Sequence, residues 1–180
     1  MTTIEVQTTD AAEKALVDKF GVSRAPLPLV LAVAPNGAIT GGFPQKVTEA
    51  QLAGAFVGPS MAAGLKALQD RKLVLLCVQS RHQAVPAGVR EFAADDQYKA
   101  ATVVVTMDPA DAAEARHLKD LSVDADRDVP ATLLLAPPGH ILGKFDATVT
   151  RGQLIEKLKS SQSCCPGGKC GPGGCCGPKK

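Results

Sequence analysis

Five cysteines stand close together near the end of this 180-residue chain: Cys164, Cys165, Cys170, Cys175 and Cys176. They follow the spacing CC-x4-C-x4-CC, symmetric about the central cysteine, in a segment built mostly of Gly, Pro and Lys. Such a composition cannot form a hydrophobic core, so we expect a disordered tail. The thiols are the groups in this segment that can do chemistry.

Metal binding is the first chemistry that this cluster predicts. Thiolates are soft ligands for Zn(II), Cu(I) and similar thiophilic ions, and a tetrahedral all-cysteine site needs four of them. The glycines let a short loop close, while Lys169, Lys179 and Lys180 offset the negative charge of clustered thiolates. The spacing is not that of a standard zinc finger and no histidine completes a set, so the metal can be Zn or Cu.

Thiol–disulfide chemistry is the second interpretation. Adjacent cysteines have Cα atoms about 3.8 Å apart, below the usual minimum of about 4.4 Å for a disulfide. A bond within either vicinal pair would therefore be strained and easily reduced, which suits switching or metal capture better than stapling. Vicinal pairs on flexible tails are similar to the metal-transferring tail of mercuric reductase. A tail whose cysteines do neither is the third interpretation.

The remaining cysteine and a short polar loop follow one another in the middle of the chain. Cys77 lies in an apolar stretch, Lys72 to Val78, and there we expect an inert core thiol, since free cysteines are usually buried. Ser80, Arg81 and His82 come next. They can bind an anion or act as an acid–base pair, and an ordinary solvated loop is the alternative.

Two stretches of the chain share one pattern at a constant offset of 102 residues. Each reads as a proline-led apolar strand, a Pro/Gly turn, a second strand and a helix. The matching pairs are Pro28 and Pro130, Pro35 and Pro137, Gly37 and Gly139, Phe43 and Phe145, and Gln51 and Gln153. Upstream, residues 10–13 and 111–114 both read Asp-Ala-Ala-Glu. The shared period indicates a duplicated structural unit.

Apolar periodicity and capping residues predict the elements around these two stretches. In the first part we expect strands over residues 3–7, 29–34 and 38–43, with helices over 11–20 and 48–56. In the second part we expect strands over 72–78, 101–106 and 130–135 and a strand after the turn at 137–139. The helices of that part are expected over 61–69, with Ser60 as its cap, and over 86–94, 112–121 and 150–159.

This order resembles the thioredoxin-like fold superfamily. From Lys72 onward the predicted order is βαβαββα, and Pro130 stands where that family has a cis-proline. The resemblance implies an α/β protein with one partial repeat (βαββα), whose leading strand and first helix would lie before Met1, and one full domain. It also implies a protein-docking surface at the proline loops, here Val129 and Pro130, and Pro28 in the first copy.

The full copy departs from the thioredoxin-like enzymes in its active-site segment. Those enzymes carry Cys-x-x-Cys after the first strand of the domain, where a helix N-terminus lowers the pKa of the attacking thiol. Residues 78–86 read Val-Gln-Ser-Arg-His-Gln-Ala-Val-Pro and contain no cysteine. A dithiol oxidoreductase that uses the residues of this domain alone is therefore not expected.

Composition excludes several other classes of protein. The net charge is +2 and aromatic residues make up 3 % of the chain, so we expect no nucleic-acid binding. No apolar run is long enough for a membrane span, and the N-terminus lacks the features of a signal peptide. We therefore expect a cytoplasmic protein, in a compartment where thiols stay reduced.

The sequence thus predicts three regions: a partial thioredoxin-like repeat over residues 1–58, a full domain over 59–161 and a Cys-rich tail over 162–180. The favoured function is non-catalytic binding, with the folded part docking a protein and the tail cysteines holding Zn or Cu. The first alternative is a redox protein in which the tail supplies the dithiol. The second is a structural module whose open strand edges mediate self-association.

Overall fold

A computed structural model describes residues 2–162, and the five tail cysteines lie outside this range. The chain divides into two units, which are described separately. Unit 1 consists of Met1–Ala32 and Gly41–Phe56, and unit 2 of Val33–Thr40 and Val57–Lys180. Over the part of the chain that the structure describes, no helix has the length and apolar character that a membrane span requires.

Unit 2 is built on a four-stranded mixed sheet in the order β4-β3-β5-β6. Strand β3 (Leu73–Val78) is parallel to β4 (Thr102–Met107) and antiparallel to β5 (Ala131–Ala136). Strand β6 (His140–Asp146) continues the sheet antiparallel to β5, with a bulge opposite Leu134 and Leu135. Because β3 is central and covered on both faces, it is a continuous apolar run rather than an alternating one.

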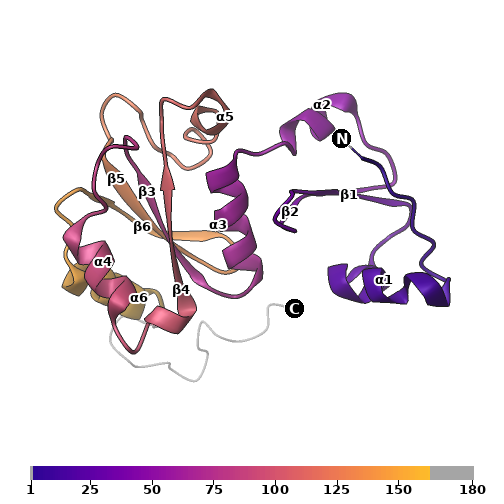
Figure 1. Cartoon of the computed structure of the whole chain (residues 1–180), viewed down its shortest axis with the longest axis horizontal. Coiled ribbons are helices and arrows are strands. Elements are labelled where there is room, and N and C mark those ends of the chain that lie inside the picture. The colour runs from indigo at the N-terminus through magenta and orange to yellow at the C-terminus, as the bar shows by residue number, and fades with distance from the viewer. Residues whose placement is uncertain (1, 163–180) are drawn as a thin grey trace, which may run out of the picture. The chain divides into compact units, whose positions relative to one another are not determined.

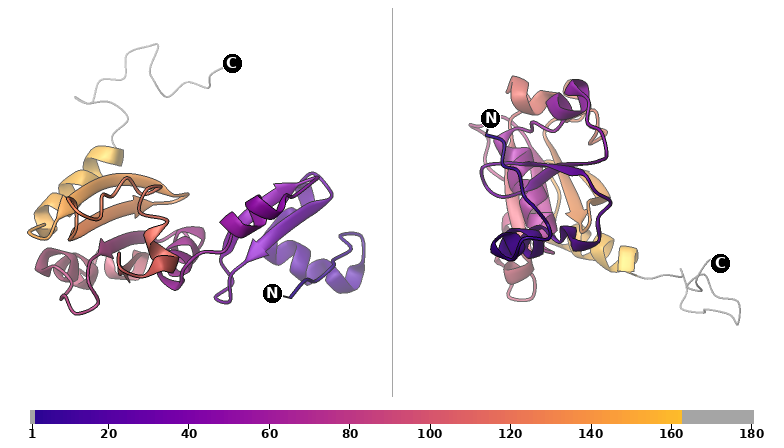
Figure 2. Two further views of the ribbon diagram at one scale, coloured as in Figure 1. Left: turned by 90° about the horizontal axis from the view of Figure 1, so that it is seen from above. Right: turned by 90° about the vertical axis from the view of Figure 1, so that its right-hand side faces the viewer.

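Helices cover both faces of this sheet (Figure 1). Helix α3 (Pro59–Gln69) and the segment around α5 (Ala112–Ala115) pack on one face. Helices α4 (Ala87–Ala94) and α6 (Arg151–Gln162) lie side by side on the other. The orange β5–β6 hairpin and the yellow helix α6 that follows it are seen together in Figure 2.

The sheet therefore separates two apolar cores. Alternate residues of β3 and β5 enter them: Leu76 and Leu133 pack on the α3 side, Leu75 and Leu134 on the α4–α6 side. From β3 to α6 the elements run βαβαββα. The α/β class expected from the sequence is confirmed.

The first part of the chain, residues 2–56, contains short helices and a hairpin of two strands, and the turn of that hairpin (residues 33–40) is grouped with unit 2. Its elements are two 3-10 turns (Ala11–Glu13 and Val22–Arg24), helix α1 (Lys14–Phe20), strands β1 (Leu29–Val33) and β2 (Ile39–Pro44), and helix α2 (Glu49–Gly54). Gly21 ends α1 with a φ of 63°, a conformation in which the absence of a Cβ atom avoids strain. Strands β1 and β2 form a two-stranded sheet.

The two proline-strand-turn-strand-helix stretches share local geometry. The Leu27–Pro28 and Val129–Pro130 peptide bonds are both cis. At the start of α2, the Thr48 and Gln51 side chains form a capping box, with Gln51 Oε1 accepting the Thr48 N–H at 2.9 Å. At the start of α6, Gln153 Oε1 accepts the Thr150 N–H at 2.8 Å. Residues of the two stretches that are 102 positions apart thus make equivalent capping hydrogen bonds.

Three predictions about elements are wrong. Residues 3–7 form no strand, so the first part lacks the leading β of the predicted βαββα. At the offset of 101, these residues are equivalent to residues of β4, and β4 is stabilised by its pairing with β3. Among the described residues, unit 1 has no strand in the place of β3, and Ile4 is 73 % exposed.

The other two corrections concern the helix that contains Glu114 and the start of α3. The helix predicted over 112–121 ends at Ala115, after which the chain continues in turns. Glu114 is fully buried and accepts hydrogen bonds from the backbone N–H groups of Ser60 (2.7 Å) and Met61 (3.4 Å). Ser60 lies inside α3, whose N-cap is Gly58, and Glu114 binds the two N–H groups that a capping side chain at position 58 would bind.

Candidate functional site

One edge of the sheet of unit 2 gathers the polar residues that the sequence singled out. Val78 pairs with Met107 of β4 and with Ala131 of β5. Since β3 and β4 are parallel and β5 is antiparallel, the loops after β3 and β4 meet the loop before β5 at this edge. Ser80, Arg81 and His82 therefore share an edge with Val129 and Pro130.

Arg81 is bound by two carboxylates from the loop after β4. Its Nε donates to Asp108 Oδ2 at 3.0 Å, and one of its terminal nitrogens donates to Asp111 Oδ2 at 2.9 Å. The second oxygen of each carboxylate holds the backbone: Asp108 Oδ1 accepts the Ala110 N–H, and Asp111 Oδ1 accepts the Ala113 N–H. Both acidic residues thus fix the local chain and bind the guanidinium at once.

These ion pairs determine the charge of the loop. The Ala110 N–H and the Arg81 guanidinium hold the pKa of Asp108 below its usual value. One guanidinium beside two carboxylates carries a local excess of negative charge, and an anion approaching Arg81 meets that charge. The geometry favours a structural role for Arg81 over binding of a free anion.

The loop after β3 is closed by a buried amide. Gln79 is buried at the end of the strand, where its backbone N–H donates to Met107 O and its side chain donates to Gln83 O at 2.7 Å. The Gln83 N–H returns a bond to Ser80 O at 2.9 Å. The side chains of Ser80 and His82 are left exposed to solvent on the outside of this closed loop.

A hollow of about 450 Å³ lies against the loop that carries the cis-proline. It is lined by Val129 and Pro130 together with Arg127, Asp128, Lys144, Phe145, Asp146, Ala147 and Thr148. Half-buried Val129, Pro130 and Phe145 supply apolar surface, and charged side chains surround it. Apolar surface with a few polar groups is the composition of binding sites, and these lining residues include neither Cys nor His.

Charged pairs fix the rim of this hollow. Lys144 Nζ donates to Asp128 Oδ2 at 2.7 Å and to Ser122 O at 3.1 Å, which ties β6 to the loop before β5. The backbone N–H of Asp124 and the Lys144 ammonium hold the pKa of Asp128 below its usual value. Bonds from the Thr148 hydroxyl and N–H lower the pKa of Asp146. Both carboxylates are therefore ionised at neutral pH.

Cys77 is the one cysteine among the described residues, and it is fully buried in β3. Burial raises the pKa of its thiol, although the Thr132 hydroxyl donates to Sγ at 3.9 Å and partly opposes this effect. A neutral, buried thiol is a poor nucleophile and a poor metal ligand. The prediction of an inert core thiol agrees with this placement.

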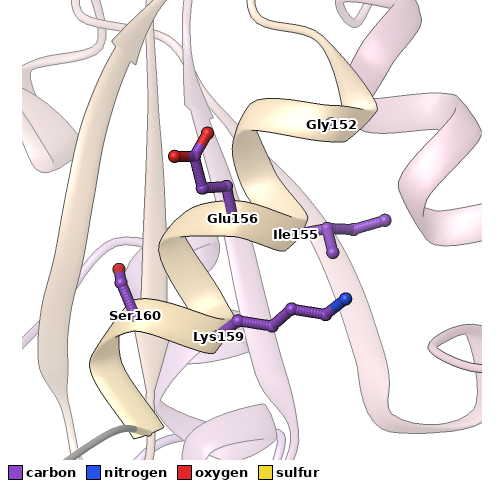
Figure 3. Close-up of a pocket in the computed structure, with 5 residues that line it drawn as sticks. All are labelled: Gly152, Ile155, Glu156, Lys159 and Ser160. Carbon is purple, nitrogen blue, oxygen red and sulfur yellow. The ribbon is translucent and has the colours of Figure 1, made fainter. Parts of the chain in front are cut away.

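A second depression, of about 520 Å³, lies along α6 (Figure 3). Its lining residues all come from this one helix: Gly152, Ile155, Glu156, Lys159 and Ser160. The side chains drawn in Figure 3 project from a single convex helix surface. Because one helix face cannot surround a ligand, this depression is not a candidate site.

The other predicted site residues belong to unit 1 or lie outside the described residues. Pro28 belongs to unit 1, where its carbonyl accepts the Gln45 N–H at 2.7 Å. Cys164, Cys165, Cys170, Cys175 and Cys176 lie outside the described residues. Within residues 2–162, no group of three or more His, Cys, Asp or Glu side chains is arranged to hold a metal ion.

Sequence reasoning missed the charged partners at this edge. Asp108, Asp128 and Lys144 lie in a loop, a loop and a strand, and no motif links them to Arg81 or Pro130. Asp111 caps helix α5 and also binds Arg81. The available signal in the sequence was a charged residue, such as Asp108, directly after a strand that ends at this edge.

Comparison with known proteins finds a structural likeness but no match in sequence. No protein-family model matches the chain, and no curated protein matches it. A solved structure described as the solution structure of a thioredoxin from Thermus thermophilus is similar over 59 % of this chain and 84 % of its own. The sequence identity is 15 % and the TM-score is 0.38.

Proposed function

We propose that this protein is a non-catalytic, thioredoxin-like binding protein whose five tail cysteines hold a thiophilic metal ion. The observation that carries the proposal is the position of Cys77. This thiol is buried in the central strand, and the exposed loop after that strand carries Ser80, Arg81 and His82 instead of cysteine. Any thiol chemistry or thiolate binding of a metal therefore falls to the tail.

The sheet edge suits docking rather than catalysis. Its hollow offers apolar surface at Val129, Pro130 and Phe145, bordered by the Asp128–Lys144 ion pair. An extended protein segment presents backbone polar groups and apolar side chains, which match such a surface. The closed loop of Gln79 and Gln83 keeps the neighbouring part of the edge rigid. We assign this face to a protein partner.

The tail supplies the metal ligands under this proposal. Four thiolates complete a tetrahedral Zn(II) site, and fewer suffice for Cu(I). Lys169, Lys179 and Lys180 favour the deprotonated thiols that metals require. A reducing compartment such as the cytoplasm keeps these thiols free, so we place the protein there.

We also infer that the chain arose by duplication of a thioredoxin-like unit. The constant offset of 102 residues and the matching capping boxes at Thr48 and Thr150 support this inference. The second copy holds the central strand β3 and both cores, and the proposed docking face belongs to it.

Thiol–disulfide exchange is the second candidate function. It is favoured by the two vicinal pairs, since a strained disulfide between adjacent cysteines is easily reduced. In this case the sheet edge would dock the substrate and the tail would supply the dithiol. Reduction of insulin disulfides catalysed by the full chain, with dithiothreitol as the electron donor, would support this function over metal storage if it is lost when the tail cysteines are changed to serine.

The metal proposal is tested on protein purified under reducing, chelator-free conditions. The variant carries serine at all five tail positions, and Cys77→Ser is the matched control, since it removes one thiol from the core and none from the tail. Stoichiometric Zn or Cu in the wild type and the control, and none in the tail variant, is the expected result. Equal metal content in all three proteins would contradict the proposal.

A further inference from the structure

In the second copy of the repeat, the strand that is equivalent to β1 has a neighbouring strand on each of its two edges. At the offset of 102 residues, β1 (Leu29–Val33) corresponds to residues 131–135 of β5. Strand β5 pairs with β6 on one edge and with β3 on the other. Strand β1 pairs with β2 in a two-stranded sheet, and no described strand takes the place of β3 beside it.

The burial of equivalent residues differs accordingly. Val30 is 37 % exposed, whereas its equivalent Thr132 is 0 % exposed. On the opposite face, Val33 is 43 % exposed, and its equivalent Leu135 is 7 % exposed. Strand β1 therefore presents apolar side chains to solvent on both faces as well as an open edge.

The hydrogen bonds of the hairpin show which backbone groups lie on that edge. The Ala34 N–H donates to Ala38 O, and Pro28 O accepts the Gln45 N–H, so the even-numbered residues face β2. Because strand residues alternate, the N–H and C=O groups of Leu29, Leu31 and Val33 point to the other edge. These groups are positioned to pair with an incoming strand.

We propose that β1 pairs with β1 of a second copy of this chain, which joins two hairpins into one four-stranded antiparallel sheet. A two-fold axis at Leu31 makes the pairing antiparallel, as β3–β5 is. The arrangement places Leu31 of each copy opposite the other, where β5 has Leu133 opposite Leu76. The residues of this surface are different from those of the docking face and those of the tail.

The sequence of β1 resembles that of β3, the strand that pairs with β5 in the second copy. Residues 29–33 read Leu-Val-Leu-Ala-Val, and residues 73–77 of β3 read Leu-Val-Leu-Leu-Cys. A second β1 therefore offers side chains of the same kind that β3 offers to β5. The strand carries no charged residue, so two copies meet at the axis without repulsion between like charges.

Open edges are usually guarded by charges, proline or a bulge. Strand β6 is guarded in this way, because it carries Lys144 and Asp146 and lies beside a bulge. The edge of β4 is uncharged, but several of its side chains are already packed under helices of unit 2. Strand β2, the other edge of the hairpin, ends in Pro44. Strand β1 contains neither a charged residue nor a proline, so we assign the partner strand to its edge.

Sedimentation velocity of the full chain over a range of concentrations tests this proposal. Reductant and chelator are present, and the five-serine tail variant is measured in parallel, so that links through the tail are excluded. The wild type and the tail variant are both expected to form a dimer. A monomer at every concentration would overturn the proposal.

Two variants then test whether β1 forms the contact between the two copies. Val33→Lys brings a charge to the paired face, and Leu31→Pro removes an outward N–H, which an edge strand tolerates but a paired strand does not. Each should raise the dimer Kd by roughly 30-fold or more, with an unchanged circular dichroism spectrum. Ile141→Lys, at an exposed position on β6, is the matched control and should leave Kd unchanged. A dimer that resists both variants and is lost with Thr106→Lys would assign the contact to β4 and overturn the proposal.

Discussion

Gly58 and Glu114 form a pair whose coupling can be predicted from the geometry. A Cβ atom added at Gly58 would lie 2.5 and 2.6 Å from the two carboxylate oxygens of Glu114. Gly58→Ala must therefore push the carboxylate away from the Ser60 and Met61 N–H groups that it binds. A hydrogen bond to a charged group contributes about 1.5–3 kcal/mol, so we expect a loss of about 2 kcal/mol in the free energy of unfolding.

The same substitution should behave differently when Glu114 is alanine. Gly58 has φ −67° and ψ 164°, which alanine adopts without strain. With the carboxylate absent, alanine at this position restricts the unfolded chain and should stabilise the protein by about 0.5 kcal/mol. The two effects of Gly58→Ala thus differ by about 2.5 kcal/mol, which is the coupling energy of the pair.

Urea unfolding followed by far-UV circular dichroism measures this double-mutant cycle. Gly64→Ala is the matched control, because a Cβ atom there meets only Val74 at 3.9 Å, an ordinary contact. It should stabilise helix α3 equally with and without Glu114. A Gly58→Ala cost that is the same in both backgrounds would refute the claim that Glu114 caps α3.

Three further predictions concern other parts of the chain. Asp108→Asn should lower the stability at neutral pH, and since the folded pKa is depressed, the difference from the wild type should vanish as the pH falls well below about 4; a constant difference in urea midpoint down to pH 2 would contradict this. In the five-serine tail variant, Cys77 should react with a thiol reagent roughly 1000-fold more slowly in the folded protein than in urea; rapid reaction of the native protein would show an accessible thiol. Thr150→Ala should lower the free energy of unfolding by about 1 kcal/mol through loss of the α6 capping box, and Thr48→Ala offers the matched loss at α2; no change in either variant would discount both caps.

The sequence was sufficient to predict the β5–β6 hairpin and helix α6 because the local signals of that stretch agree. A proline-led apolar run, a Pro/Gly turn and a capping pair at Thr150 and Gln153 all indicate the same hairpin and helix. The resemblance to thioredoxins rested on this order. Burial of Cys77 also followed from its apolar neighbours in β3.

Contacts between distant residues were not predictable. Glu114 reads as an exposed helix residue, and its burial depends on Gly58, which is 56 positions earlier in the chain. The Arg81–Asp108 and Lys144–Asp128 pairs likewise join separate loops and strands. The strand predicted over residues 3–7 failed because a strand needs a neighbour, which periodicity alone does not supply.

The most direct test of the account is the metal content of the full chain, measured by elemental mass spectrometry after purification without chelator. Wild type and Cys77→Ser are compared with the variant in which Cys164, Cys165, Cys170, Cys175 and Cys176 are serine. We predict a stoichiometric thiophilic metal in the first two proteins and none in the third. The same metal content in all three, or no metal in any of them, would contradict metal binding by the tail.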